Sequence, residues 1–230
     1  MKILSVVIPA YNEERFIGTL LEKIKAVDLA PLGLTMELIV VDDCSKDRTA
    51  AIVEVVPGVR LIRQPKNGGK GRAVRAGIEA AHGDLLIIQD ADLEYDPQDY
   101  IPMLRALLDG RADIVYGSRY LGRGRHDNQS LAAYLGGRSL SLVAWLFTGT
   151  FLTDTVTAFK LFRRQDIAAL PLETSGFELD HEITSRMLAR GKTIVEVPIR
   201  YYPRSREEGK KIGLRDWFIG TRTFWRYRNG

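Results

Sequence analysis

Two aspartates follow an apolar run of the chain, and their spacing suits the binding of a metal ion. Residues 85–88 form a run that we interpret as a buried strand, and Asp90 and Asp92 come directly after it. In an open α/β sheet, ligands bind outside the carboxyl ends of the strands. If extended geometry continues past the strand, both carboxylates point to the same side. Hard oxygen donors of this kind suit Mg²⁺ or Mn²⁺, which are usually shared with substrate phosphates.

A simpler interpretation is that one of these aspartates caps the next helix. Asp96 already fits that role, because Asp is a preferred N-cap and the following Pro97 is a preferred first residue of a helix. We therefore favour metal and phosphate binding over capping for Asp90 and Asp92.

Polar residues also follow the strand that we expect at 3–9. A tyrosine beside a helix N-terminus, such as Tyr11, can stack on a base, and Glu13 can accept a hydrogen bond from a ring N–H. The alternative is an ordinary helix start with Asn12 as the N-cap, which needs no ligand.

Two further segments carry groups that suit phosphate chemistry. The strand expected at 37–43 ends in Asp42 and Asp43, where a single capping carboxylate would suffice. The segment Asn67–Gly71 places glycines and Lys70 at the start of a helix, which is a natural phosphate cradle. A glycine pair before a helix is also typical of a simple turn.

Strand and helix patterns alternate through the first half of the chain. We expect strands at 3–9, 37–43, 59–62, 85–90, 113–117, 159–162 and 193–199, and helices at 16–27, 47–53, 70–81, 97–108, 131–147, 180–190 and 214–228. A glycine pair within 131–147 is expected to interrupt that helix. The alternation predicts an α/β fold, with a mainly parallel sheet and helices on both faces. No repeat or low-complexity linker divides the chain, so we expect one compact unit.

Composition limits the class of protein. The chain has 230 residues, a net charge of +4 and one cysteine, Cys44, which excludes an intrachain disulfide and fits a reducing cytosol. We find no signal peptide and no apolar stretch near the roughly 20 residues needed to span a bilayer. Basic residues cluster at 119–125 and 200–228, which indicates phosphates, nucleic acid or a membrane surface as an anionic partner.

Taken together, these segments resemble family 2 glycosyltransferases of the GT-A fold. Within that family they are most similar to the dolichyl-phosphate mannose synthase-like branch, which glycosylates polyprenyl phosphates. The matching segments are 7–14, 40–43, 67–71, 89–94, 117–119, 197–199 and 203–211. The resemblance implies a single GT-A domain over 1–230, with a nucleotide-sugar-binding half at 1–118, an acceptor and loop half at 119–212, and a C-terminal amphipathic helix at 213–230.

The resemblance also implies roles for individual residues. The donor would be held by Pro9, Tyr11, Glu13, Val40, Asp42, Lys70, Asp90, Ala91, Asp92, Arg204 and Lys210. The metal ion would be bound by Asp90 and Asp92, with Glu94 as a third ligand. Arg204 and Lys210 would contact the diphosphate, where cations lower the barrier because negative charge develops on the leaving group. A solvated basic loop is the alternative for the segment that carries these two residues.

The acceptor depends on whether the reaction needs a base. Transfer to a hydroxyl needs a carboxylate that takes its proton, and Asp180 is the best candidate, although a helix N-cap would also explain it. A lipid phosphate is already an anion and needs cations, for which Arg119 and Arg138 are well suited. The apolar residues 131–147 suit contact with a polyprenyl chain, or else form an ordinary buried helix. Asp92, Arg119, Arg138, Asp180 and Arg204 are thus the candidate catalytic residues.

The C-terminal residues 214–228 mix aromatic and basic side chains at helical spacing. This is typical of a helix on an anionic lipid surface, although packing against the domain is the alternative. We therefore predict an inverting, metal-dependent enzyme that moves a sugar from GDP-mannose or a UDP-sugar to dolichyl or undecaprenyl phosphate. We expect it at the cytoplasmic membrane face, with no nucleic-acid partner. The alternatives are transfer to a soluble or polymer hydroxyl, and nucleotide-sugar binding without turnover.

Overall fold

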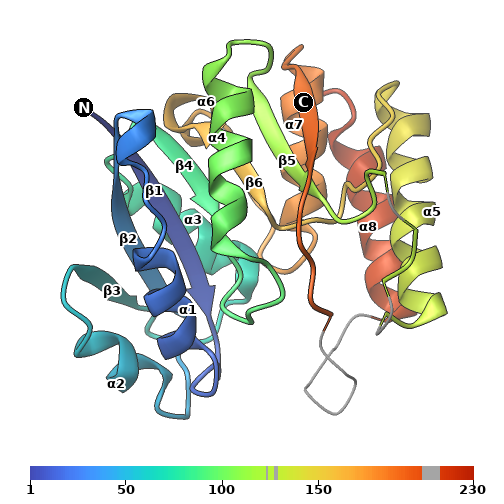
Figure 1. Ribbon diagram of the computed structural model, residues 1–230. Helices are drawn as coiled ribbons and strands as arrows, with labels where there is room; N and C mark the ends of the chain where they lie inside the picture. The colour runs from blue at the N-terminus through green and yellow to red at the C-terminus, as the bar shows by residue number, and fades with distance from the viewer. Residues whose placement is uncertain (123, 127–128, 204–212) are drawn as a thin grey trace.

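A seven-stranded sheet runs through the molecule, with helices on both of its faces (Figure 1). The computed structural model describes residues 1–122, 124–126, 129–203 and 213–230. The strands are β1 (Lys2–Ala10), β2 (Leu34–Asp42), β3 (Val59–Arg63), β4 (Leu85–Ile88), β5 (Ile114–Ser118), β6 (Lys160–Arg163) and β7 (Ile194–Pro198). Each of them lies where the sequence predicts a strand.

The expected helices also form. They are α1 (Ile17–Lys25), α2 (Thr49–Glu54), α3 (Lys70–Ala80), α4 (Tyr100–Leu108), α5 (Leu131–Thr148), α7 (Leu179–Ala189) and α8 (Leu214–Tyr227), together with α6 (Arg164–Ala168) and the 3₁₀ turns η1 (Ala30–Leu32) and η2 (Pro97–Asp99). The sequence did not predict α6 and η1. The expected interruption of α5 at Gly136 and Gly137 is wrong, because the helix continues through both glycines.

The strand order is β3-β2-β1-β4-β6-β5-β7. Strand β6 pairs antiparallel with both β4 and β5, and the other pairings are parallel, which confirms the mainly parallel sheet. The chain leaves β1 toward β2 on one side, and β4 lies on the other side. Ligands of doubly wound sheets bind at such a switch point, outside the carboxyl ends of the strands.

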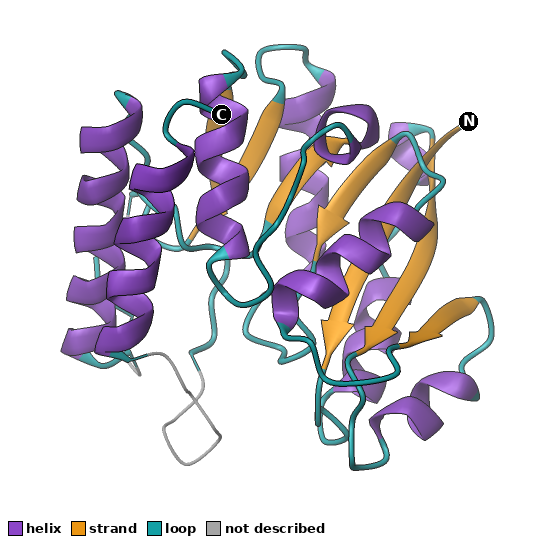
Figure 2. Ribbon diagram, turned by 180° about the vertical axis from the view of Figure 1, so that it is seen from behind, coloured by secondary structure: helices purple, strands orange, loops and turns teal. Residues whose placement is uncertain are grey.

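Alternate side chains of each strand enter two separate cores, because strand side chains alternate between faces. On one face, Val6 and Ile8 of β1 pack in a core that includes residues of α1, α2 and α4. On the other face, Val7 packs in a core with residues of α3, α6 and α7. Figures 1 and 2 show these two helical layers from opposite sides.

Helices α5 and α8 pack side by side at one end of the molecule, next to α7 (Figure 1). Leu140 and Ala144 of α5 pack with Phe224 of α8 in a small third core, and Trp217 Nε1 donates to Ser139 Oγ at 2.8 Å. Helix α5 has 18 residues and a mean hydropathy of 1.2, with 17% of them buried. By length and composition alone it could span a membrane, contrary to our expectation that no stretch approaches that length. The glycine-rich middle of α5 therefore does not shorten it.

Candidate active site

The carboxyl ends of β1, β2 and β4 bring the predicted donor segments together. Ala10 is in register with Asp42, and the Asp43 N–H donates to the Ala10 carbonyl at 2.9 Å. On the other side of β1, the Gln89 N–H donates to the Val7 carbonyl at 2.9 Å. Segments 9–14, 42–45 and 89–94 thus lie side by side at the switch point of the sheet.

The segment after β1 is fixed by contacts with the loop between β2 and α2. Asn12 has a left-handed backbone, with φ of 57°, and its Oδ1 accepts the Lys46 N–H at 2.8 Å. The Glu13 N–H donates to Thr49 Oγ1 at 2.8 Å. Helix α1 begins only at Ile17, so the alternative that Asn12 caps it is wrong. The contacts instead hold the backbone around Tyr11 and Glu13 beside Asp42.

The two carboxylates after β2 have different surroundings. Asp43 accepts the N–H groups of Gly68 and Gly69 at 2.9 and 2.7 Å, so it braces the glycine turn before α3. Asp42 is buried, and both of its oxygens lie 3.3 Å from the Ser45 N–H. A structural role therefore accounts for Asp43, while Asp42 stays a predicted donor contact.

The glycines at the start of α3 have a packing role that the sequence did not reveal. A Cβ at Gly69 would lie 2.5 Å from the Ser175 carbonyl oxygen, and one at Gly71 would lie 2.8 Å from the Thr174 oxygen. Gly69 also has a positive φ of 88°. Close approach of the loop at 174–176 therefore requires glycine here. The phosphate cradle at this turn stays a prediction.

Four charged side chains lie close together beside the start of α3. Lys70 Nζ lies 2.8 Å from Asp90 Oδ1 and 3.4 Å from Asp180 Oδ2. Lys160, on β6, lies 3.0 Å from Asp180 Oδ1. The structure thus joins three predicted site residues to Lys160, which sequence reasoning missed. The feature that could have identified Lys160 is a lysine within the otherwise apolar predicted strand 159–162.

The electrostatics at Asp90 favour a bound cation. Burial raises the pKa of Asp90, and the carboxylates of Asp92 and Asp180 raise it further, while Lys70 opposes them. The carboxylates of Asp90, Asp92 and Asp180 face the ammonium groups of only Lys70 and Lys160 in this cluster, so a divalent cation would balance the remaining negative charge. Asp90 and Asp92 fit such an ion, because Mg²⁺ is typically held by one or two carboxylates together with substrate phosphates.

Asp92 lies in a turn, not in an extended segment. Strand β4 ends at Ile88, Leu93 has a φ of 59°, and Asp92 Oδ1 accepts the Glu94 N–H at 3.1 Å. The extended geometry on which the alignment of the two carboxylates depended therefore does not continue past β4. Asp96 caps η2 as predicted, because its carboxylate accepts the Gln98 N–H at 3.0 Å.

Glu94 is buried and does not complete a three-ligand metal site with Asp90 and Asp92. Its carboxylate is hydrogen-bonded to Tyr201, whose pKa is raised by burial and by this contact. Within residues 1–122, 124–126, 129–203 and 213–230, no three Asp, Glu, His or Cys side chains group closely enough to hold a metal ion. The structure therefore does not assemble the predicted set of Asp90, Asp92 and Glu94, and only the first two remain our metal ligands.

The two predicted acceptor arginines lie around one aromatic ring. The guanidinium carbons of Arg119 and Arg138 lie 5.3 and 5.9 Å from the centre of Tyr120. Arg119 forms a two-point ion pair with Asp154, and Arg138 Nη1 donates to the Thr153 carbonyl at 2.6 Å. Sequence reasoning missed Asp154, because no pattern links it to a residue so distant in the chain.

Asp180 is not a helix cap. Helix α7 begins at Leu179, with Glu178 at the N-cap position, so that alternative is wrong. Burial raises the pKa of Asp180, but Lys160 and Lys70 outweigh it and leave the pKa below its usual value. The carboxylate is thus held as an anion between two lysines.

Five predicted donor contacts remain, of which the structure describes three. Pro9, Val40 and Ala91 are buried, and their contacts with a donor stay predictions. Arg204 and Lys210 lie outside the described residues, and their predicted roles stay predictions.

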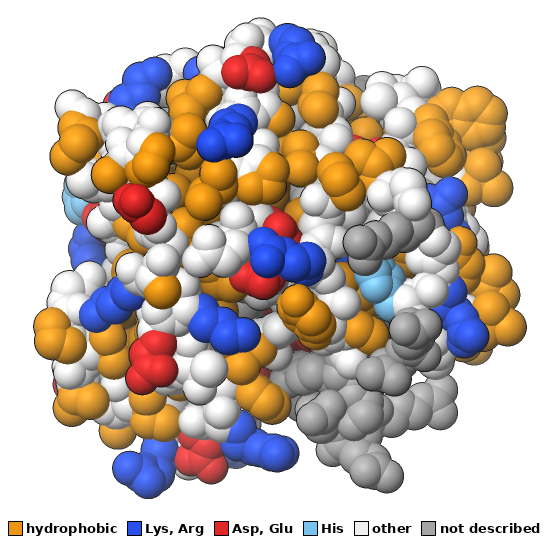
Figure 3. All heavy atoms as spheres, viewed as in Figure 1, with side chains coloured by type: hydrophobic (Ala, Val, Ile, Leu, Met, Phe, Trp, Pro, Cys, Tyr) orange, Lys and Arg blue, Asp and Glu red, His pale blue; other side chains and the backbone are white. Residues whose placement is uncertain are grey.

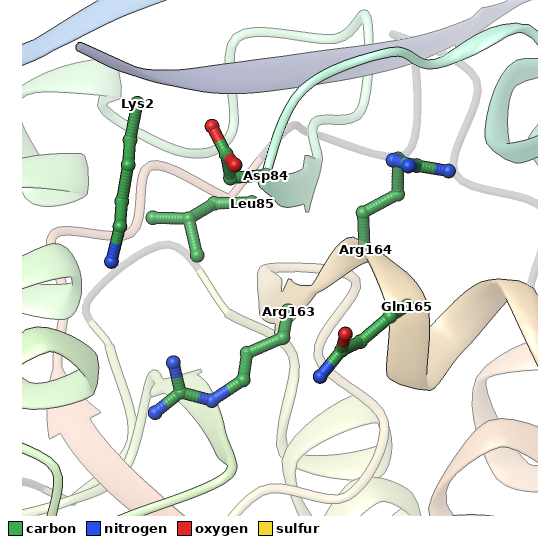
Figure 4. Close-up of a pocket in the computed structure, with 6 residues that line it drawn as sticks. All are labelled: Lys2, Asp84, Leu85, Arg163, Arg164 and Gln165. Carbon is green, nitrogen blue, oxygen red and sulfur yellow. The ribbon is translucent and has the colours of Figure 1, made fainter.

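A surface depression of about 230 Å³ lies at the opposite end of the sheet (Figure 4). It is lined by Lys2, Asp84, Leu85, Arg163, Arg164 and Gln165. These residues lie at the starts of β1 and β4, at the end of antiparallel β6 and at the start of α6, so the depression is separate from the carboxylate cluster.

Comparisons with known proteins agree with the motifs. The model for glycosyl transferase family 2 matches residues 5–170. The dolichol-phosphate mannosyltransferase of Pyrococcus furiosus is 33% identical over 220 residues, which is 93% of this chain and 60% of that protein. The undecaprenyl-phosphate mannosyltransferase of Micrococcus luteus is 30% identical over 224 residues, covering 93% of this chain and 88% of the relative. The chain thus spans less than two thirds of the Pyrococcus protein.

Solved structures share the fold at lower identity. Glucosyl-3-phosphoglycerate synthase from Mycobacterium tuberculosis in complex with UDP has a TM-score of 0.74 and 22% identity, over 99% of this chain and 80% of that one. Mannosyl-3-phosphoglycerate synthase from Rubrobacter xylanophilus has a TM-score of 0.73 and 20% identity, over 98% and 72%. These likenesses confirm the GT-A fold. Other structures of the mycobacterial synthase contain UDP with Mn²⁺ or Mg²⁺.

Proposed function

The chain belongs to glycosyl transferase family 2, and on that premise we propose that it transfers a sugar from GDP-mannose or a UDP-sugar to a polyprenyl phosphate. The phosphate oxygen attacks the anomeric carbon, a new carbon–oxygen bond forms with inversion, and the nucleoside diphosphate leaves. The names of the Pyrococcus and Micrococcus relatives support this acceptor class.

The observation that carries the proposal is the position of Asp180 between two lysines. Lys160 and Lys70 lie 3.0 and 3.4 Å from its carboxylate oxygens. A general base must take up a proton, and two adjacent cations oppose protonation of this carboxylate. A hydroxyl acceptor would depend on such a base. A phosphate acceptor arrives as an anion and does not, which favours the lipid phosphate.

The donor diphosphate is assigned to the space between Asp90, Asp92 and the start of α3. A bound Mg²⁺ or Mn²⁺ would neutralise the charge that develops on the leaving diphosphate. Lys70 supplies a further positive charge there, at the N-terminal end of the α3 dipole. Tyr11, Glu13 and Asp42 would recognise the nucleoside from the adjoining strand ends.

The acceptor phosphate is assigned to the region around Tyr120. Arg119 and Arg138 both lie against that ring, and their guanidinium groups match phosphate geometry. Asp154 holds Arg119 in one orientation, so this cation needs no reorganisation when the phosphate arrives. Helix α5, which carries Arg138, offers an apolar path for the lipid chain.

We assign membrane contact to the outer surfaces of α5 and α8. Exposed apolar residues are Leu131, Leu135, Leu142, Trp145 and Leu146 on α5 and Leu214, Phe218 and Trp225 on α8. Figure 3 shows hydrophobic side chains gathered along the edge where α5 lies. The neighbouring Arg215 and Arg222 would suit anionic lipid headgroups. This surface supports the proposed peripheral position at the cytoplasmic membrane face.

Radiolabelled GDP-mannose and UDP-sugars, offered with Mn²⁺ and undecaprenyl phosphate in detergent, test the proposal. We expect label to enter the organic phase with the wild-type chain and to be lost with Asp92→Ala. The exposed variant Asp109→Ala is the matched control and should keep activity. Substantial metal-dependent transfer by Asp92→Ala would contradict the assigned metal site.

Two other results would support the competing functions. Label that appears only on added soluble sugars would replace the lipid phosphate by a hydroxyl acceptor. Donor binding by calorimetry without release of nucleoside diphosphate would indicate a binding module without turnover. Both outcomes would overturn the proposed reaction.

A further inference from the structure

Lys160 is a buried cation at the start of β6. Its side chain is fully buried, it lies 4.8 Å from the centre of the Tyr116 ring, and its ammonium group donates to the Thr157 carbonyl. A buried ammonium group is costly unless it is paired and hydrogen-bonded. Asp180 Oδ1, at 3.0 Å, supplies the paired charge. An apolar side chain would avoid this cost in the strand, so the lysine calls for a functional reason.

Lys160 is the inner end of a row of alternating charges. The row continues from Asp180 to Lys70 and then to Asp90, with successive contacts of 3.0, 3.4 and 2.8 Å. Side-chain exposure rises along it, from 0% at Lys160 through 8% and 13% to 23% at Asp90. The row thus leads from the core to the carboxylate assigned to the metal and diphosphate.

Lys70 is shared between two carboxylates, and its position depends on their relative pull. Its ammonium group lies closer to Asp90 than to Asp180. Lys160 neutralises Asp180 from the other side, which weakens the pull of Asp180 on Lys70. Charge interactions at these distances are strong inside a protein, so loss of the inner charge would draw Lys70 away from Asp90.

We propose that Lys160 is a positioning residue, which holds Asp180 so that the ammonium group of Lys70 stays at Asp90, where the donor diphosphate binds. Lys160 itself does not touch the donor. The inference rests on the proposed function, because that function assigns the diphosphate to Asp90 and Lys70.

Two uncharged variants test this role. Lys160→Met keeps the length of the side chain without its charge, and Lys160→Gln keeps a hydrogen-bond donor and is better suited to fold. We expect each folded variant to bind GDP or UDP with Mn²⁺ about tenfold more weakly by calorimetry, since coupled charges typically interact on this scale. We also expect a crystal structure of the variant to show Lys70 Nζ more than about 4 Å from Asp90, beyond ion-pair distance.

Lys192→Met is the matched control. Lys192 also pairs with an aspartate, Asp166 at 2.9 Å, but it follows α7 at the end of the sheet away from Asp90. This variant should bind the diphosphates as the wild type does. The double variant Lys160→Met/Asp180→Asn removes both inner charges, so it should regain most of the affinity lost in Lys160→Met. A packing defect at position 160 would not be repaired in this way.

A folded Lys160→Gln with wild-type affinity, or with Lys70 unmoved at Asp90, would overturn the inference. Its failure is distinct from failure of the proposed function. If the wild type does not glycosylate the lipid phosphate but Lys160→Gln still displaces Lys70, the acceptor is wrong and the positioning role stands. If transfer occurs and the variant binds normally, the reaction stands and Lys160 has only a structural role.

Discussion

Arg119 and Asp154 form a two-point ion pair beside the proposed acceptor site. Arg119 Nε lies 2.6 Å from Asp154 Oδ2, and Nη2 lies 2.7 Å from Oδ1. Asp154 is fully buried, and its N–H donates to Glu196 at 2.8 Å. Asp154 thus links Arg119, which follows β5, through its carboxylate and Glu196 of β7 through its backbone N–H, in addition to the direct pairing of the two strands. The pair both stabilises the fold and fixes the direction of Arg119.

Asp154→Ala should lower the free energy of unfolding by about 3–5 kcal/mol, because it leaves the buried guanidinium of Arg119 without its partner. Urea denaturation measures the loss. The exposed pair of Arg111 and Asp109, at 2.9 Å, is the control, and Asp109→Ala should cost less than about 1 kcal/mol. Similar losses in the two variants would contradict the stabilising role of Asp154.

Gly71→Ala should weaken the binding of nucleoside diphosphates as well as the fold. Its Cβ would meet the backbone of residues 174–176 at 2.8 Å, so the loop or the start of α3 must shift. We expect a stability loss of about 1–3 kcal/mol by denaturation, as for overpacked sites. Gly136→Ala is the control, because nothing lies within 4 Å of its Cβ and alanine favours a helix by about 0.5–1 kcal/mol. Unchanged diphosphate affinity in Gly71→Ala would separate the turn from the donor site.

Much of the sheet, and the position of the proposed donor site at the carboxyl ends of its strands, could be predicted because both depend on local sequence patterns. Apolar runs bounded by turn residues placed the seven strands, and the polar groups after β1, β2 and β4 marked the switch point. Confirmed details such as the Asp96 cap depend on neighbouring residues only. These signals need no knowledge of the rest of the chain.

Long-range contacts account for what the sequence did not show. Lys160 meets Asp180 across 20 residues of the chain, and Arg119 meets Asp154 across 35. Sequence reasoning offered a phosphate cradle or a simple turn for the glycines at the start of α3 and missed their packing role, since the loop at 174–176 comes from a distant part of the chain. The chain is not extended at Asp92, and the next residue, Leu93, has a left-handed backbone conformation. No residue pattern predicted that conformation.

His181 should make the protein sensitive to acid. Burial lowers its pKa to about 4, with Lys160 and Lys70 adding to the effect and Asp180 opposing it. In the unfolded chain the pKa is near 6.5, so between these values the unfolded state binds more protons. The stability is complete above pH 6.5 and is lost as the pH falls toward 4, by about 3 kcal/mol.

Denaturation at a series of pH values measures this effect, and His181→Gln should flatten the profile between pH 6.5 and 4. His82→Gln, at a histidine on the surface, is the control and should leave the slope in place. A slope that survives in His181→Gln would assign the acid sensitivity to other groups.

The surface formed by α5 and α8 should bind anionic membranes. Phe218 and Trp225 are exposed on α8, and Arg222 lies between them in the sequence, so the helix presents aromatic and cationic groups together. Burial of these two large apolar side chains in the headgroup region contributes several kcal/mol at most to the free energy of membrane binding. In the double variant the other exposed apolar residues of α5 and α8 still contribute to binding. Phe218→Ser/Trp225→Ser should therefore weaken binding to phosphatidylglycerol vesicles by about tenfold or more in sedimentation assays. Val55→Ser removes an exposed apolar side chain at the far end of α2, and it should bind as the wild type does. Equal binding by all three proteins would contradict lipid contact through α8.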